Sequence, residues 1–138
     1  MTRRPSDAWR RLPVMLLSIG LLAACAGTPP ESRSLAVRTA NGSGVTGSVT
    51  LTARDDGTTR VTVDVDPAGH PNMPAHIHSG TCNELIPQPE FPLLNIVEGQ
   101  STTDLIVPLD ELLRGPVALN LHASNDDMKT STACVELR

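Results

Sequence analysis

The chain has 138 residues and a formal net charge of −4, and Trp9 and Phe91 are its only aromatic residues. This length suffices for one domain. From Cys25 onward, seven Arg and Lys residues stand against fourteen Asp and Glu residues. An acidic chain with neither aromatic stacking platforms nor a cationic track argues against nucleic-acid binding.

The N-terminus has the pattern of an export signal. Residues 1–11 carry four arginines, and an apolar run follows that is too short to span a bilayer comfortably. The run ends in Leu-Ala-Ala-Cys, which resembles a bacterial lipobox. The resemblance implies a signal peptide over 1–24, a lipid on the Cys25 sulfur, a tether over 25–40 and a cell-envelope location, anchored to a membrane on the exported side. An ordinary signal peptide with a chance cysteine is the alternative.

Strand patterns dominate the remainder, and 41–138 is predicted to form one β-sandwich domain. The strand patterns cover residues 34–39, 45–53, 60–66, 101–109, 116–124 and 132–137. The second and third of these alternate on either side of an Asp-Gly turn, which predicts a hairpin. Residues 83–100 hold three prolines and predict a long ordered loop over one side of the sheet, and 110–115 predict a helical turn. Short strands without a convincing helix favour an all-β fold, an antiparallel sandwich or barrel.

Cysteine usage points to one disulfide. Cys82 and Cys134 remain once Cys25 carries the lipid, and an even pair in an oxidising compartment predicts that they are bonded. The bond would close a loop of roughly fifty residues and stabilise the fold by about 4 kcal/mol in the chain-entropy model. Two free thiols acting as metal ligands are the alternative.

Three of the four histidines are predicted to lie on the outer face of the sheet. His76 and His78 point the same way, because side chains at i and i+2 share a face of a strand. In a later strand His122 is in phase with Asn120 and opposite to the leucines that are expected in the core. Two interpretations stay open, three solvated surface histidines or a metal site, because His-x-His alone is a weak signal.

Other side chains near this segment are further candidates. His70 is a possible fourth ligand, with a solvated loop histidine as the alternative. Met73 is a possible soft ligand for Cu(I), with gap-filling at the sheet edge as the alternative. The acidic pair Asp126 and Asp127 is interpreted as a solvated loop.

The stretches AHIHSGTC and ALNLHASNDDMKTSTACVEL resemble the copper/zinc superoxide dismutase family. The resemblance runs from about residue 47 to residue 137. It implies a Greek-key β-barrel, a copper site outside the barrel wall formed by His76, His78 and His122, and a disulfide between Cys82 and Cys134. The chordin-type domain of bacterial secreted proteins is a second relative, because it also carries a His-x-His-x-Gly segment.

The departures from that family restrict the expected function. Residues 83–100 contain no histidine, so the family's zinc site and its bridging histidine are absent. Ser131 stands where the family has its active-site arginine, so the electrostatic guide for an anionic substrate is missing. Three neutral imidazoles suit copper best among Cu, Zn and Ni. Copper is therefore the expected cofactor, and zinc is not.

Two classes of function remain from the sequence. One is a copper-binding, dismutase-like lipoprotein with an incomplete active site, either weakly redox-active or a copper carrier, in which no catalytic residue is assigned. The other is a non-catalytic β-sandwich envelope protein that keeps the fold without metal. The expected partners are a metal ion and a membrane reached through the lipid, and the sequence does not predict the oligomeric state.

Overall fold

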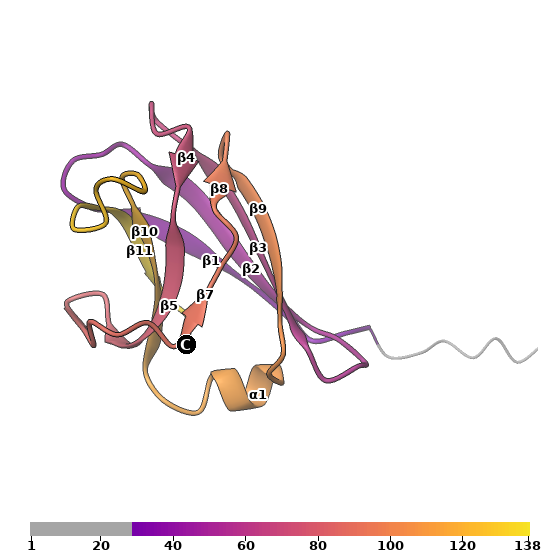
Figure 1. Cartoon of the computed structure of the whole chain (residues 1–138). Coiled ribbons are helices and arrows are strands. Elements are labelled where there is room, and N and C mark those ends of the chain that lie inside the picture. The colour runs from indigo at the N-terminus through magenta and orange to yellow at the C-terminus, as the bar shows by residue number, and fades with distance from the viewer. Residues whose placement is uncertain (1–28) are drawn as a thin grey trace, which may run out of the picture.

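The computed structural model describes residues 29–138, which form an antiparallel β fold curled into a half-barrel (Figure 1). The frame consists of β1 (Ser32–Thr39), β2 (Thr46–Ala53), β3 (Thr59–Asp66), β5 (Ala75–Thr81), β9 (Gln100–Leu105), β10 (Val117–His122) and β11 (Ser131–Glu136). Four strands have two residues each: β4 (Asn72–Met73), β6 (Glu84–Leu85), β7 (Phe91–Pro92) and β8 (Ile96–Val97). The helical turn predicted near residue 110 is α1 (Leu109–Leu112). Among the described residues, no helix is long and apolar enough to cross a bilayer.

The strands run in the order β4-β8-β9-β3-β2-β1-β11-β10-β5-β6. The sheet has two halves, one containing β9, β3 and β2 and the other containing β11, β10 and β5. β1 joins them, because its first part pairs with β2 and its last two residues pair with β11. The predicted hairpin is β2–β3, in register from Thr46 opposite Asp66 to Ala53 opposite Thr59. The final strand returns beside the first, and the chain crosses three times between the halves, after β4, after β7 and after β9, which are connections of the Greek-key type. The expected antiparallel all-β fold is thereby confirmed.

The core lies between the two halves and is aliphatic. Alternate residues of the long strands fill it, as their period-2 pattern predicts. Its members with almost no exposed surface include Val45, Val49, Leu51, Val61, Val63, Ile77, Leu119, Leu121 and Leu137. Because these alternate residues face the core, the residues between them point away from it. The three histidines are among the residues that point away from the core.

The sandwich begins earlier than the predicted boundary at residue 41. β1 pairs with β2 continuously from Ser32 opposite Thr52 to Val37 opposite Gly47, and Val37 is buried. The expected tether over 25–40 therefore does not hold for its second half, which is a strand of the sheet. Residues 1–28, with the predicted signal peptide and Cys25, lie outside the described residues.

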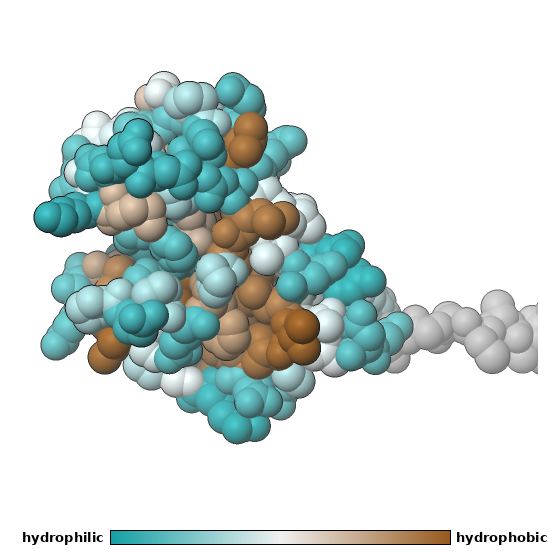
Figure 2. Space-filling model, viewed as in Figure 1, coloured by the Kyte–Doolittle hydropathy of each residue, from teal (hydrophilic) through white to brown (hydrophobic). Residues whose placement is uncertain are grey.

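The proline-containing segment 83–100 closes the open side of the half-barrel. β7 pairs with β5 and β8 pairs with β9 (Figure 1). Between them Leu93 N donates to Ala75 O at 3.1 Å, and Leu94 N donates to Thr103 Oγ1 at 3.0 Å. Apolar side chains gather on this side of the molecule in the space-filling view (Figure 2). Leu94 and Val97, which belong to segment 83–100, are among the exposed apolar residues. The predicted ordered loop over one side of the sheet is therefore present, with short strands inside it.

Candidate metal centre

Two paired strands bring three histidines together. β5 carries His76 and His78, β10 carries His122, and the register sets His76 opposite Asn120 and His78 opposite Ala118. One ring nitrogen from each histidine lies within 4.8 Å of the others. The closest pair is His76 Nδ1 and His122 Nε2, 3.2 Å apart. The convergence that the resemblance in sequence implied is therefore observed.

The hydrogen bonds identify the nitrogen that each ring can offer. His78 Nδ1 donates to the carbonyl oxygen of Ile86 at 2.8 Å, so its lone pair lies on Nε2. That Nε2 is buried and has no hydrogen-bond partner. His76 Nδ1 and His122 Nε2 face each other and share one hydrogen bond, which an ion would replace, so the candidate donor set is these two nitrogens and Nε2 of His78. An orphaned buried nitrogen beside two others is what a metal ion would satisfy.

The spacing of these nitrogens is close to what an ion requires. Ligands bound at 2.0–2.1 Å in a tetrahedral arrangement lie about 3.3 Å apart. The His76–His122 pair already has this separation, at 3.2 Å. The 4.8 Å limit on the separations within the group is wider than this, so the remaining separations would have to shorten for one ion to bind all three rings. The three residues thus fit a metal ion with only side-chain adjustment.

The interpretation of these residues as three solvated surface histidines is wrong. His78 is 6% exposed and His122 is 7% exposed, whereas His76 is partly exposed. They point away from the aliphatic core, as predicted, but other parts of the chain cover them. The cluster is consequently shielded on most sides and reaches solvent next to His76.

The disulfide holds one of these covering segments in place. Cys82 and Cys134 are bonded, with Cα atoms 5.8 Å apart, which confirms the predicted pair and excludes free thiol ligands at these positions. Cys134 lies opposite Asn120, on the histidine side of the sheet. The segment after β5 is therefore fixed at Cys82 by the disulfide and at Ile86 by the bond from His78, and Ile86 N donates back to Ser79 O at 2.9 Å. We call residues 82–86 the disulfide loop.

Burial also affects the protonation of His76 and His122. It lowers the pKa of His76, and the nearby His78 lowers it further. The pKa of His122 is lowered first by burial and then by His76 and His78, with weaker opposing effects from the backbone of Met128 and from Asp127. Metal ligation needs neutral imidazole. The fold therefore favours the ligand form of both rings.

The other sequence candidates do not join the group. His70 lies in a turn, where its backbone N–H donates to Pro67 O at 2.8 Å. It is not part of the histidine cluster. Met73 is fully buried in the core, with Thr132 Oγ1 3.4 Å from its sulfur, so it fills the interior. Asp126 and Asp127 are exposed, and Asp127 accepts a hydrogen bond from Thr130 N, as expected of a solvated loop.

Three groups around the cluster were not identified as functional from the sequence. They are the Ile86 carbonyl, the Asn120 amide and the Ser131 hydroxyl. Asn120 is only 6% exposed and shares its strand face with His122. A polar residue two positions before a histidine on one strand is a usable signal for such a neighbour. No sequence pattern identifies the carbonyl of Ile86, since it acts through the backbone.

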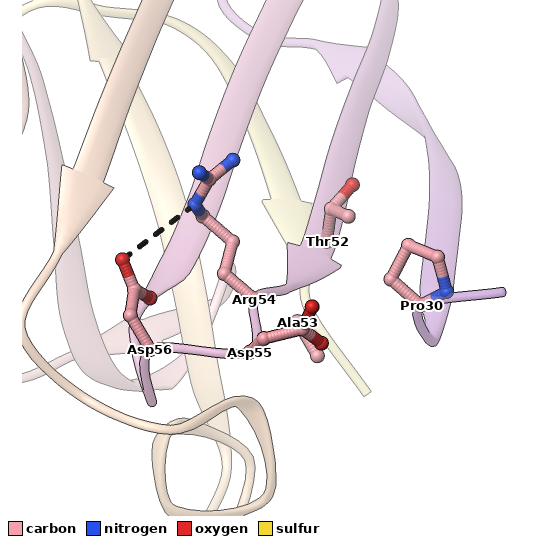
Figure 3. Close-up of a pocket in the computed structure, with 6 residues that line it drawn as sticks. All are labelled: Pro30, Thr52, Ala53, Arg54, Asp55 and Asp56. Atoms are coloured by element: carbon pink, nitrogen blue, oxygen red, sulfur yellow. Dashed lines mark ion pairs between the residues drawn. The ribbon is translucent and has the colours of Figure 1, made fainter. Parts of the chain in front are cut away.

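A separate hollow of about 320 Å³ lies at the β2–β3 turn (Figure 3). Its lining residues are Pro30, Thr52, Ala53, Arg54, Asp55 and Asp56. The Asp56 carboxylate accepts hydrogen bonds from the N–H and hydroxyl of Thr58, which lower its pKa, and Arg54 Nε lies 4.0 Å from it. These charges are already paired within the turn, so the hollow is a feature of the hairpin.

Comparison of the chain with protein family models, with curated proteins and with solved structures finds no match. The functional assignment therefore depends on the three histidines and on what surrounds them.

Proposed function

We propose that this chain is an envelope-anchored copper-binding lipoprotein with a superoxide dismutase-like fold. Its site is the cluster of His76, His78 and His122, and it is at most weakly redox-active, serving in copper binding or superoxide defence. The observation that carries the proposal is the convergence of three ring nitrogens, with the buried Nε2 of His78 lacking any hydrogen-bond partner.

The donor set supports copper over the other candidates. The group contains three imidazoles and neither a carboxylate nor a thiolate. Imidazole suits Cu, Zn and Ni, and the affinity order for divalent ions peaks at Cu(II). Copper would supply a one-electron couple at this site. The protein's own part is to hold the rings of His76 and His122 neutral, to orient His78 through Ile86 and to exclude water from all but the His76 side.

Weak activity follows from what surrounds the cluster. The resemblance that suggests a dismutase also requires a bridging histidine and an arginine, and this chain lacks both at the matching positions. Ser131 stands at the arginine position and donates its hydroxyl hydrogen to Asn120 Oδ1. No cationic side chain therefore takes the arginine's place at that position, and attraction of an anionic substrate is weaker.

Metal analysis of the full chain, purified in detergent and loaded with Cu(II), tests the proposal. We expect one copper per chain, with strong loss in His76→Ala, His78→Ala and His122→Ala. His70→Ala is the matched control and should keep full occupancy, because His70 lies outside the cluster. Copper-free protein, or an equal loss in the control, would reject the site and favour a non-catalytic envelope β-sandwich. Superoxide dismutation by the loaded protein should be slow or undetectable.

A further inference from the structure

A fourth polar side chain faces the three histidines. Asn120 lies on β10 two residues before His122 and directly opposite His76 on β5. It is 6% exposed, so its amide is buried with the rings. Asn120 Nδ2 is 3.5 Å from His122 Nε2, the same nitrogen that faces His76 Nδ1 at 3.2 Å. The amide therefore shares the space that an ion would enter.

The position of this amide is that of a ligand. Neighbouring ligands of a tetrahedral ion with bonds of 2.0–2.1 Å lie about 3.3 Å apart. Asn120 Nδ2 is 3.5 Å from His122 Nε2. This distance is within a few tenths of an ångström of the separation expected between two ligands of one ion. An ion bound by His122 would consequently lie within reach of the amide with no movement of the backbone.

The Ser131 hydroxyl allows the amide to present either end. In the structure Ser131 Oγ donates to Asn120 Oδ1, and the Ala133 carbonyl oxygen lies 3.4 Å from the same hydroxyl. A half-turn about the Cβ–Cγ bond exchanges the oxygen and nitrogen of an amide, which are nearly the same size. The hydroxyl could then accept from Nδ2 and donate to Ala133 O, because it is both a donor and an acceptor. The oxygen would face the ion while the buried polar groups keep partners.

We propose that Asn120 is the fourth ligand of the three-histidine site and binds the metal ion through its amide oxygen. This inference rests on the copper site proposed above. A neutral oxygen donor is harder than imidazole and favours Cu(II) over Cu(I), which prefers soft ligands. Asn120 thus biases the site toward the oxidised ion, and Ser131 is the positioning residue that orients the amide.

Copper affinity and the Cu(II) EPR spectrum of the full chain test this inference. Asn120→Leu keeps the same branching and number of non-hydrogen atoms but has no oxygen donor, and we expect it to lower Cu(II) affinity at least tenfold and to change the Cu(II) hyperfine pattern. Cu(I) affinity should fall much less. Asn120→Asp supplies an oxygen ligand with charge and should bind Cu(II) at least as tightly as wild type. Ser131→Ala should lower Cu(II) affinity in the same direction by a smaller factor.

The outcomes separate this inference from the proposed function. If wild type binds copper and each histidine variant loses it, but Asn120→Leu keeps the wild-type affinity and spectrum, only the fourth ligand is wrong. If Asn120→Leu raises Cu(II) affinity, the amide competes with the metal and the inference is also wrong. If wild type binds no copper, both proposals are wrong. Should Asn120→Leu lose its far-UV circular dichroism, Ser131→Ala decides: an unchanged affinity and spectrum would reject the inference.

Discussion

At the scale of single residues, burial determines which protonation state of the histidines the fold accepts. His76 and His122 both have a lowered pKa, first because burial disfavours the charged ring and second because a neighbouring histidine adds positive charge. A buried imidazolium without a carboxylate partner is costly. His76 and His122 therefore resist protonation in the metal-free protein.

This predicts how the stability of the metal-free protein depends on pH. The folded-state pKa of His122 lies below the ordinary value of 6.5, so below that pH the unfolded chain takes up protons that the folded chain does not. The free energy of unfolding should have its full value above pH 6.5 and should decrease as the pH falls from 6.5 toward 5. Urea titrations of metal-free protein at pH 7.5, 6.5, 5.5 and 5 measure it. His122→Gln should show a smaller decrease, and an equal decrease would contradict the explanation.

Strand periodicity predicted which way the histidines point but could not predict that they are buried. The side chains of His76, His78 and His122 lie opposite the leucine and valine face, because the two-residue period of a strand allows nothing else. Their burial comes from segments that are distant in sequence, such as Ile86, whose carbonyl accepts the hydrogen of His78 Nδ1. Such a contact leaves no periodic pattern in the sequence.

At the scale of elements, the disulfide loop is the part that connects the fold to the cluster. Its two fixed points are the Cys82–Cys134 bond and the hydrogen bond from His78 Nδ1 to Ile86 O. Gly80 has a φ of +106°, and a Cβ there would collide with the carbonyl oxygen of Glu84, so the chain needs glycine where it turns into the loop. The pairing of the two cysteines was predictable from their number and from the expected compartment, whereas the path of the loop over the histidines was not.

Removing the disulfide should therefore weaken metal binding as well as the fold. In the double variant Cys82→Ser, Cys134→Ser we expect Cu(II) affinity to fall by about 10- to 100-fold, the usual cost of losing an outer-shell partner of a ligand. The Ile86 carbonyl would no longer be held against His78, so the ring could rotate or change tautomer. Competition titration with a chelator, at a temperature where circular dichroism shows a folded variant, measures the loss.

Loss of stability alone must be separated from this effect. The disulfide spans 52 residues and contributes about 4 kcal/mol in the chain-entropy model. Leu51→Ala in β2 is the matched control, because Leu51 is fully buried in the core and its truncation costs about 2–5 kcal/mol. The control should keep wild-type Cu(II) affinity. If both variants lose affinity equally, the disulfide loop has no specific role in orienting His78.

At the scale of the whole molecule, the N-terminal sequence predicts the position of the chain in the cell, and this prediction can be tested at Cys25. The sandwich begins at Ser32, only seven residues after Cys25, so a lipid on that cysteine would hold the domain close to the membrane surface. Cys25→Ser removes the acyl acceptor and should leave an unlipidated precursor that migrates more slowly on gels. Metabolic labelling with a radioactive fatty acid and fractionation in detergent check this. A variant that labels and fractionates like wild type would contradict the lipoprotein assignment.

Metal binding should also be visible in the stability of the entire fold. An ion that binds only the native state stabilises it by about 2.7 kcal/mol when its free concentration is about a hundred times the dissociation constant. For a domain of this size that corresponds to a rise in Tm of roughly 10 °C. The unfolded chain has no such cluster, because His122 is separated from His76 by 46 residues and only the β5–β10 pairing brings them together.

We therefore expect Cu(II) to raise the Tm of wild type and of His70→Ala alike. His78→Ala should show little rise, because it removes one of the three ligands, the ring whose buried Nε2 has no hydrogen-bond partner. Differential scanning calorimetry at fixed free Cu(II) measures the shift, and an equal rise in His78→Ala would mean that copper stabilises the fold from some other position.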